Sequence, residues 1–96
     1  MDRAMILAKL SWIKPQLQSK YGLTEIALFG SYSRDEQTTQ SDIDLMVDFE
    51  NITYRNLFDC AVELENLFKG KKVQVVTRDG IKPRYFEAIK PDLRYA

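Results

Sequence analysis

Two short segments of the chain carry the residue types that chemistry on a phosphate ligand would need. In the first, an apolar run ends at Phe29 and is followed by Gly30 and Ser31. In the second, Asp42 and Asp44 stand one residue apart at the head of another apolar run. Glycine lets a backbone turn sharply and approach a ligand closely, and neighbouring carboxylates are suited to hold Mg²⁺. Together the segments predict a phosphate-binding turn beside a metal site, and hence chemistry on a nucleoside triphosphate.

The turn after the first strand offers several hydrogen-bond donors. A helical turn that begins at Ser31 would point free N–H groups and its positive dipole end at phosphate oxygens. The hydroxyls of Ser31 and Ser33 would add two further donors. The alternative is an ordinary strand-to-helix turn in which Ser31 caps the helix.

The two aspartates belong to a pattern that alternates along a strand. Residues i and i+2 of a strand share a face and lie roughly 6.5–7 Å apart, so Asp42 and Asp44 could converge on one ion. Asp48 has the same parity but lies roughly 13 Å further along, which is too far to share that ion. The alternative is a solvated polar face of an edge strand.

Hydrophobic periodicity predicts the elements that position these segments. Helices are expected over 2–21 and 54–69, strands over 24–29, 42–49 and 72–77, and helical turns over 31–36 and 84–89. Pro15 should interrupt the first helix near Trp12–Lys14, whereas Gly22 and Gly70 should end the two helices. The helix over 54–69 should bury Leu57, Phe58, Ala61, Leu64 and Phe68. This order of elements predicts an α+β domain, with a small mixed sheet packed against helices.

Length and composition narrow the possible functions. The 96 residues form one domain, and its 14 basic and 14 acidic residues give no net charge to attract nucleic acid or a membrane surface. Histidine is absent, which removes histidine-based triads and metal sites. The single cysteine, Cys60, lies in an apolar helical pattern and is expected to be a buried, inert thiol. No signal peptide or long apolar run is present, so we expect a cytoplasmic protein.

The combined pattern is more specific than its parts. The string Phe29-Gly30-Ser31, ten further residues and then Asp42-x-Asp44, set between two hydrophobic strands, resembles the signature of the DNA polymerase β-type nucleotidyltransferases. The resemblance is strongest to the minimal nucleotidyltransferases, or MNT proteins, and covers nearly the whole chain.

The resemblance implies a role for each matching residue. Gly30 and Ser31, with Ser33 and Arg34, would bind the nucleotide, while Asp42 and Asp44 would bind Mg²⁺ and act in catalysis. Arg34 matches an arginine that is frequent in the family; it would either contact phosphate or pair with a nearby acid.

One position departs from the family pattern. A third carboxylate usually stands on the later strand, where this chain has Gln74. Glutamine is neutral and cannot accept a proton near pH 7. Asp79 follows that strand in a predicted turn and does not occupy the position. The residues that would bind the nucleotide and the metal are therefore present, whereas the residue that would act as the usual base is missing.

From the length of 96 residues we expect no second domain that would bind an acceptor. MNT proteins pair with small helical HEPN proteins as antitoxin and toxin, and the resemblance implies transfer of AMP from ATP to a tyrosine hydroxyl of such a partner. The alternative is a catalytically impaired nucleotidyltransferase fold that neutralises its partner by contact.

Overall fold

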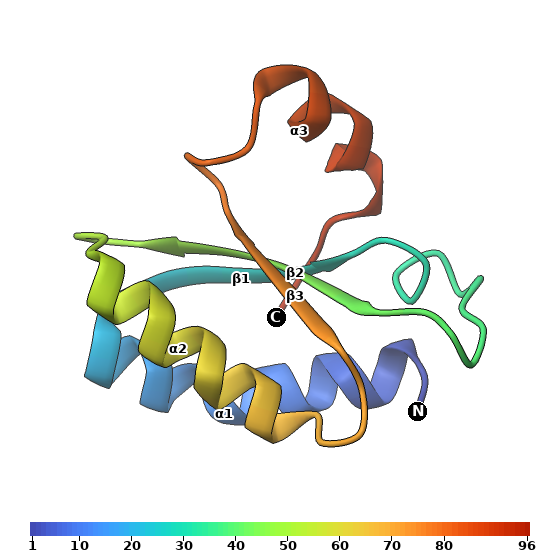
Figure 1. Ribbon diagram of the computed structural model, residues 1–96, viewed down its shortest axis with the longest axis horizontal. Coiled ribbons are helices and arrows are strands. Elements are labelled where there is room, and N and C mark those ends of the chain that lie inside the picture. The colour runs from blue at the N-terminus through green and yellow to red at the C-terminus, as the bar shows by residue number, and fades with distance from the viewer.

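The computed structural model describes all 96 residues and contains a four-stranded sheet with helices on both faces (Figure 1). Along the chain the elements are α1 (Arg3–Tyr21), β1 (Leu23–Phe29), β2 (Ile43–Phe49), α2 (Tyr54–Leu67), β3 (Val73–Thr77), α3 (Pro83–Ile89), the 3₁₀ helix η1 (Lys90–Asp92) and β4 (Arg94–Tyr95). The strand order is β3-β2-β1-β4; β2 runs antiparallel to β1 and parallel to β3. The predicted α+β class and mixed sheet are confirmed.

The two faces of the sheet have different coverings. Helices α1 and α2 lie side by side on one face (Figure 1) and enclose the main core. The β2 residues in this core are the four that alternation predicts: Ile43, Leu45, Val47 and Phe49. On the opposite face, α3 covers a smaller apolar cluster of Ala27, Phe29, Met46 and Ile89. Asp44 shares that second face, just beyond the cluster, so α3 leaves room for a polar site beside it.

The predicted break in the first helix is wrong. Helix α1 is assigned continuously through Pro15 and ends at Gly22, whose φ of 72° is the predicted left-handed cap. Proline removes the N–H that would bond to Ser11, but Pro15 and Ser11 both lie on the exposed side of the helix. Water can therefore solvate the freed carbonyl, and the buried residues on the other side hold both halves of the helix against the sheet.

Helix α2 buries part of the predicted face: Phe68 is buried, and Leu57 and Ala61 are half-buried, but Phe58 is not buried. Cys60 and Leu64 are fully buried, whereas Phe58 is 56% exposed. Burial, and then the nearby Glu63, raise the pKa of the Cys60 thiol to about 12. The predicted burial of the thiol is confirmed, and the exposure of Phe58 leaves an apolar surface on the outside of α2.

The C-terminal segment adds a strand that periodicity did not predict. Arg94 and Tyr95 form β4, which pairs antiparallel with Leu28 and Ala27 of β1. Two residues are too few to carry a repeating pattern. This segment fixes the other edge of the sheet and brings Asp92 close to the turn that follows β1. None of the helices is long and apolar enough to cross a membrane.

Candidate nucleotide-binding site

Gly30 and Asp44 are in direct apposition. Phe29 at the end of β1 pairs with Asp44 on β2, so the turn out of β1 starts beside this carboxylate. Gly30 has a φ of 78°, and a Cβ atom added to it would lie 2.2 Å from Oδ2 of Asp44. Only glycine combines that backbone conformation with such a close approach. Of the two aspartates predicted to lie beside the Gly30-Ser31 turn, Asp44 is shown there, whereas Asp42 lies just before β2.

The turn itself is compact and leaves donors free. The carbonyl of Gly30 accepts hydrogen bonds from the N–H groups of Ser33 and Arg34, at 3.0 and 3.2 Å, and the carbonyl of Ser31 accepts from Glu36 at 2.9 Å. The N–H groups of Ser31 and Tyr32 have no partner within the chain. Successive free N–H groups in a tight turn form a concave donor set that suits an anion. The predicted helical turn is therefore a series of tight turns, with its first donors unused.

The carboxylates of the two aspartates repel each other. Asp42 immediately precedes β2, and Asp44 is its second residue. Burial raises the pKa of the Asp44 carboxyl, the charge of Asp42 raises it further, and the Arg34 guanidinium partly lowers it again. Two carboxylates that repel each other in a partly buried place are stabilised when a cation binds between them. The pair is therefore suited to hold a divalent metal ion.

Gln74 occupies the position next to Asp44 on the third strand. The two residues are register partners in the parallel pairing of β2 with β3, so their side chains share the site face. No cluster of three acidic, histidine or cysteine side chains suited to a metal exists in the structure. Asp79 lies beyond the end of β3, in the turn that Gly80 closes on Thr77. The position where the family has a third carboxylate thus lies beside Asp44, and no acidic side chain takes its place.

Ser33 and Arg34 are tied to the C-terminal segment through Asp92. Ser33 is buried; its hydroxyl donates to the carbonyl of Asp92, and its own carbonyl accepts from Arg3 and Arg94, each at 3.1 Å. Arg34 donates from Nε to Glu36 at 2.9 Å and from Nη1 to Asp92 at 2.7 Å. These two bonds, the one to Glu36 first, raise the pKa of the guanidinium. Of the two roles considered for Arg34, the structure shows the pairing with acids.

The sequence expectations did not include a basic residue that lies opposite Asp42 in strand register, although it forms no ion pair with either aspartate. The N–H of Ile43 donates to the carbonyl of Lys72 at 2.9 Å, and Ile43 is the register partner of Val73. Lys72 therefore lies opposite Asp42 and shares the parity of Gln74, which places it on the site face. Alternation on β3, counted back from Gln74, was the available signal.

Comparisons with known proteins identify the family of the chain. The sequence profile of the nucleotidyltransferase domain family matches residues 10–95. A candidate protein adenylyltransferase of Methanocaldococcus jannaschii, MJ1379, is 42% identical over 85 residues, which cover 85% of each chain. The protein adenylyltransferase MntA of Thermococcus cleftensis is 33% identical over 85 residues, with 85% of this chain and 83% of MntA covered. The chain belongs to the nucleotidyltransferase family.

Solved structures show the same fold. A candidate minimal nucleotidyltransferase superposes with a TM-score of 0.79 at 29% identity, covering 98% of this chain and 95% of the other. A chain from the complex of tri-AMPylated Shewanella oneidensis HEPN toxin with MNT antitoxin superposes with a TM-score of 0.68 at 18% identity, covering 97% and 70%. At that identity the second likeness establishes the fold alone.

Proposed function

We propose that this chain transfers AMP from ATP to a hydroxyl group of a partner protein. The observation that carries the proposal is the contact of the Asp44 carboxylate with the turn at Gly30, which joins a phosphate-binding donor set to a pair of metal-binding acids. The relatives named as protein adenylyltransferases support the choice of AMP and of a protein acceptor.

The nucleotide is bound by the turn after β1. The free N–H groups of Ser31 and Tyr32 bind phosphate oxygens, with the Ser31 hydroxyl beside them. Gly30 keeps this surface open, because any side chain there would fill the space against Asp44. Ser33, which we expected to contact the nucleotide, is instead assigned the role of holding the turn through Asp92.

Asp42 and Asp44 are the residues that would hold Mg²⁺. These residues fit a cation because the two carboxylates repel each other and Asp44 is partly buried. A bound cation lowers the free-energy cost of keeping both carboxylates charged. When bound, the ion neutralises charge on the phosphates and polarises the reacting phosphoryl group. The close contact with Gly30 keeps Asp44 beside the phosphates, so the two halves of the site act on one ligand.

The reaction is a substitution at the α-phosphorus of ATP. The acceptor oxygen forms a bond to this phosphorus, the bond to the bridging oxygen breaks, and pyrophosphate leaves. The hydroxyl proton passes to solvent, because Gln74 beside Asp44 is neutral and cannot take it. General-base catalysis commonly contributes about 10²–10⁴-fold, so we expect slow transfer rather than none.

We propose a HEPN-type helical protein as the partner. The fold is shared with a chain of a HEPN–MNT complex, and the resemblance of the motifs points to the same class of partner. The position of Gln74 also favours a second candidate function, in which the chain neutralises this partner by contact and has lost the chemistry.

Transfer of label from ATP distinguishes these candidates. The chain is incubated with Mg²⁺, a HEPN-type protein from the same genome, and ATP labelled at either the α- or the γ-phosphate. We expect the partner to acquire label from α-labelled ATP only, and Asp44→Asn to abolish the transfer. Label from the γ-phosphate would contradict the proposal, because it would show phosphoryl transfer. No label from either position, together with intact inhibition of the partner, would favour neutralisation by contact.

A further inference from the structure

The outer edge of β3 has backbone groups without partners. This strand stands at the edge of the sheet and pairs only with β2. Its Lys72 carbonyl and its following Arg78 N–H are bonded to β2, at 2.9 and 3.0 Å. Backbone groups alternate between the two sides of a parallel strand. The outward-pointing groups therefore belong to the alternate residues Val73, Val75 and Thr77, of which only the Thr77 carbonyl is used, by Gly80.

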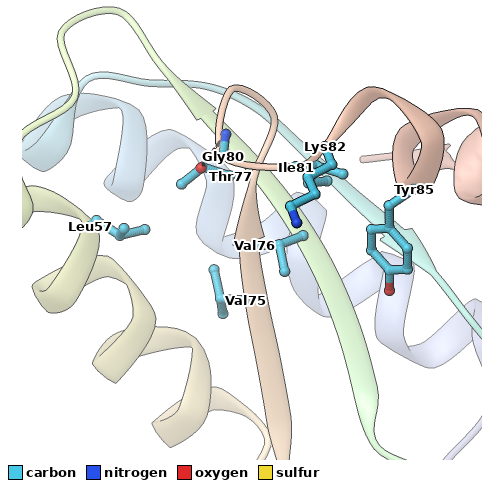
Figure 2. A pocket seen from close by; sticks show the side chains of 8 residues that line it. All are labelled: Leu57, Val75, Val76, Thr77, Gly80, Ile81, Lys82 and Tyr85. Atoms are coloured by element: carbon cyan, nitrogen blue, oxygen red, sulfur yellow. Dashed lines mark hydrogen bonds between the residues drawn. The ribbon is translucent and has the colours of Figure 1, made fainter.

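An apolar hollow follows the same edge. A cavity of about 440 Å³ is lined by Leu57 from α2, by Val75 and Val76 from β3, and by Ile81 and Tyr85 (Figure 2). A second hollow of about 210 Å³ shares Leu57 and Val75 and continues along α2. Its wall includes the exposed aromatic residues Tyr54 and Phe58. The free edge and the two hollows together form a groove that suits a segment of extended chain with apolar side chains.

The groove reaches the site through Gln74. This residue belongs to the edge strand and sits beside Asp44 on the site face. On a strand added outside β3, the residue opposite Gln74 would point to that same face. Strands lie roughly 4.8 Å apart, so it would start roughly 10 Å from Asp44, a gap that a long side chain narrows. The Gly30 turn lies on the other side of Asp44, on β1. A hydroxyl from the added strand would therefore approach opposite the nucleotide.

The charged residues near β3 restrict which segment can bind in the groove. Positive side chains that form no ion pair within the chain flank both ends of β3: Lys69, Lys71 and Lys72 before it, Lys82 and Arg84 after it. Asp79 is the one acid in the turn between the strand and Lys82. An extended segment with acidic residues on either side of its hydroxyl complements this surface.

We propose that the acceptor segment of the partner protein binds as a fifth strand along the outer edge of β3, with acidic flanks. Its hydroxyl-bearing residue stands opposite Gln74 and its apolar neighbours occupy the groove. The proposal rests on the proposed function, because it specifies how the acceptor reaches that site. An extended segment satisfies the outward N–H and carbonyl groups, whereas a helix leaves them unpaired.

The substitution Val75→Pro tests the strand pairing. It removes an outward N–H that has no partner within the chain, a place where proline is tolerated on an edge strand. Val75→Ala is the matched control, since it shortens the side chain but keeps the N–H. We expect both variants to bind Mg·ATP as the wild type does. Transfer to the HEPN-type protein should fall about tenfold or more in Val75→Pro and less than about threefold in Val75→Ala. Equal transfer by the two variants would overturn the proposal.

Amide hydrogen exchange of the wild-type chain provides a second, independent readout. The N–H groups of Val73, Val75 and Thr77 should exchange quickly in the free chain and slowly in the complex with the HEPN-type protein. This measurement needs no catalysis, so it tests the strand even if no AMP is transferred and the proposed function fails, or if Val75→Pro does not fold. Unchanged exchange in the complex would overturn the proposal. So would protection in the free chain that rises with concentration, because it would identify a second copy as the occupant.

Discussion

The contact of Gly30 with Asp44 allows a sharp test of the site by one methyl group. In Gly30→Ala the new Cβ would lie 2.2 Å from Oδ2 of Asp44, and 3.1 Å from Cγ. The carboxylate must therefore move away from the turn by roughly 1 Å. Gly70→Ala is the matched control, because Gly70 has a φ of 88° and nothing within 4 Å of its added Cβ.

The two substitutions share one cost and differ in another. At positive φ a Cβ atom costs about 1–2 kcal/mol, and this strain applies to both alanines. In a domain of this size, about 1 kcal/mol lowers the melting temperature by about 4–8 °C. We therefore expect both variants to melt about 4–16 °C below the wild type. Only Gly30→Ala displaces the carboxylate that we propose binds the metal from the turn that we propose binds phosphate, and a misplacement of about 1 Å can cost about 10²-fold in rate.

Three assays separate these effects. Thermal unfolding by circular dichroism measures the shared strain, calorimetry measures binding of Mg·ATP, and the rate of label transfer measures function. Gly70→Ala should lose stability but keep binding and transfer. Gly30→Ala should lose a similar amount of stability, bind Mg·ATP more weakly and transfer about 10²-fold more slowly. If Gly30→Ala bound and transferred like Gly70→Ala at a temperature where both are folded, the shared-site reasoning would be refuted.

Three further predictions concern the acids, the vacant base position and the thiol. Replacing Asp42 and Asp44 together by asparagine should abolish the Mg²⁺-dependent part of ATP binding in calorimetry. It should also raise the melting temperature of the metal-free protein, because the repulsion between the two carboxylates disappears. Unchanged binding would mean that these acids are only a polar strand face. Gln74→Asp should raise the rate of AMP transfer roughly 10²-fold, with some loss of stability that Mg²⁺ restores. Fast transfer by the wild type with no gain from aspartate would show that another group takes the proton. Cys60 should resist thiol reagents at pH 8 in the folded chain and react after unfolding, because its thiol is buried and its pKa is raised to about 12. Rapid labelling of the native chain would contradict this burial.

The sequence was sufficient to predict the features that repeat or that combine rare residue types. Alternation placed Ile43 to Phe49 on the correct faces of β2, and the Gly-Ser and Asp-x-Asp spacing predicted the apposition that Gly30 and Asp44 show. Such signals are local, so they survive without knowledge of the rest of the fold.

Features that depend on distant contacts were not predictable in this way. The uninterrupted helix through Pro15 depends on which side of α1 faces water. The bond from buried Ser33 to Asp92 depends on the return of the C-terminal segment, and β4 is too short to carry a pattern. The exposure of Phe58 reflects how α2 is rotated on the sheet, because a stripe of apolar residues on a helix is wider than the face that packs.

The mass of the partner protein tests the central claim most directly. A HEPN-type protein from the same genome is incubated with this chain, ATP and Mg²⁺, and its intact mass is measured, with fragmentation to locate any change. We predict the addition of an adenylyl group to a tyrosine, and no addition when Asp42 and Asp44 are both asparagine. An unchanged mass, from a partner that the chain nevertheless binds and inhibits, would contradict the account and identify the fold as a binding module.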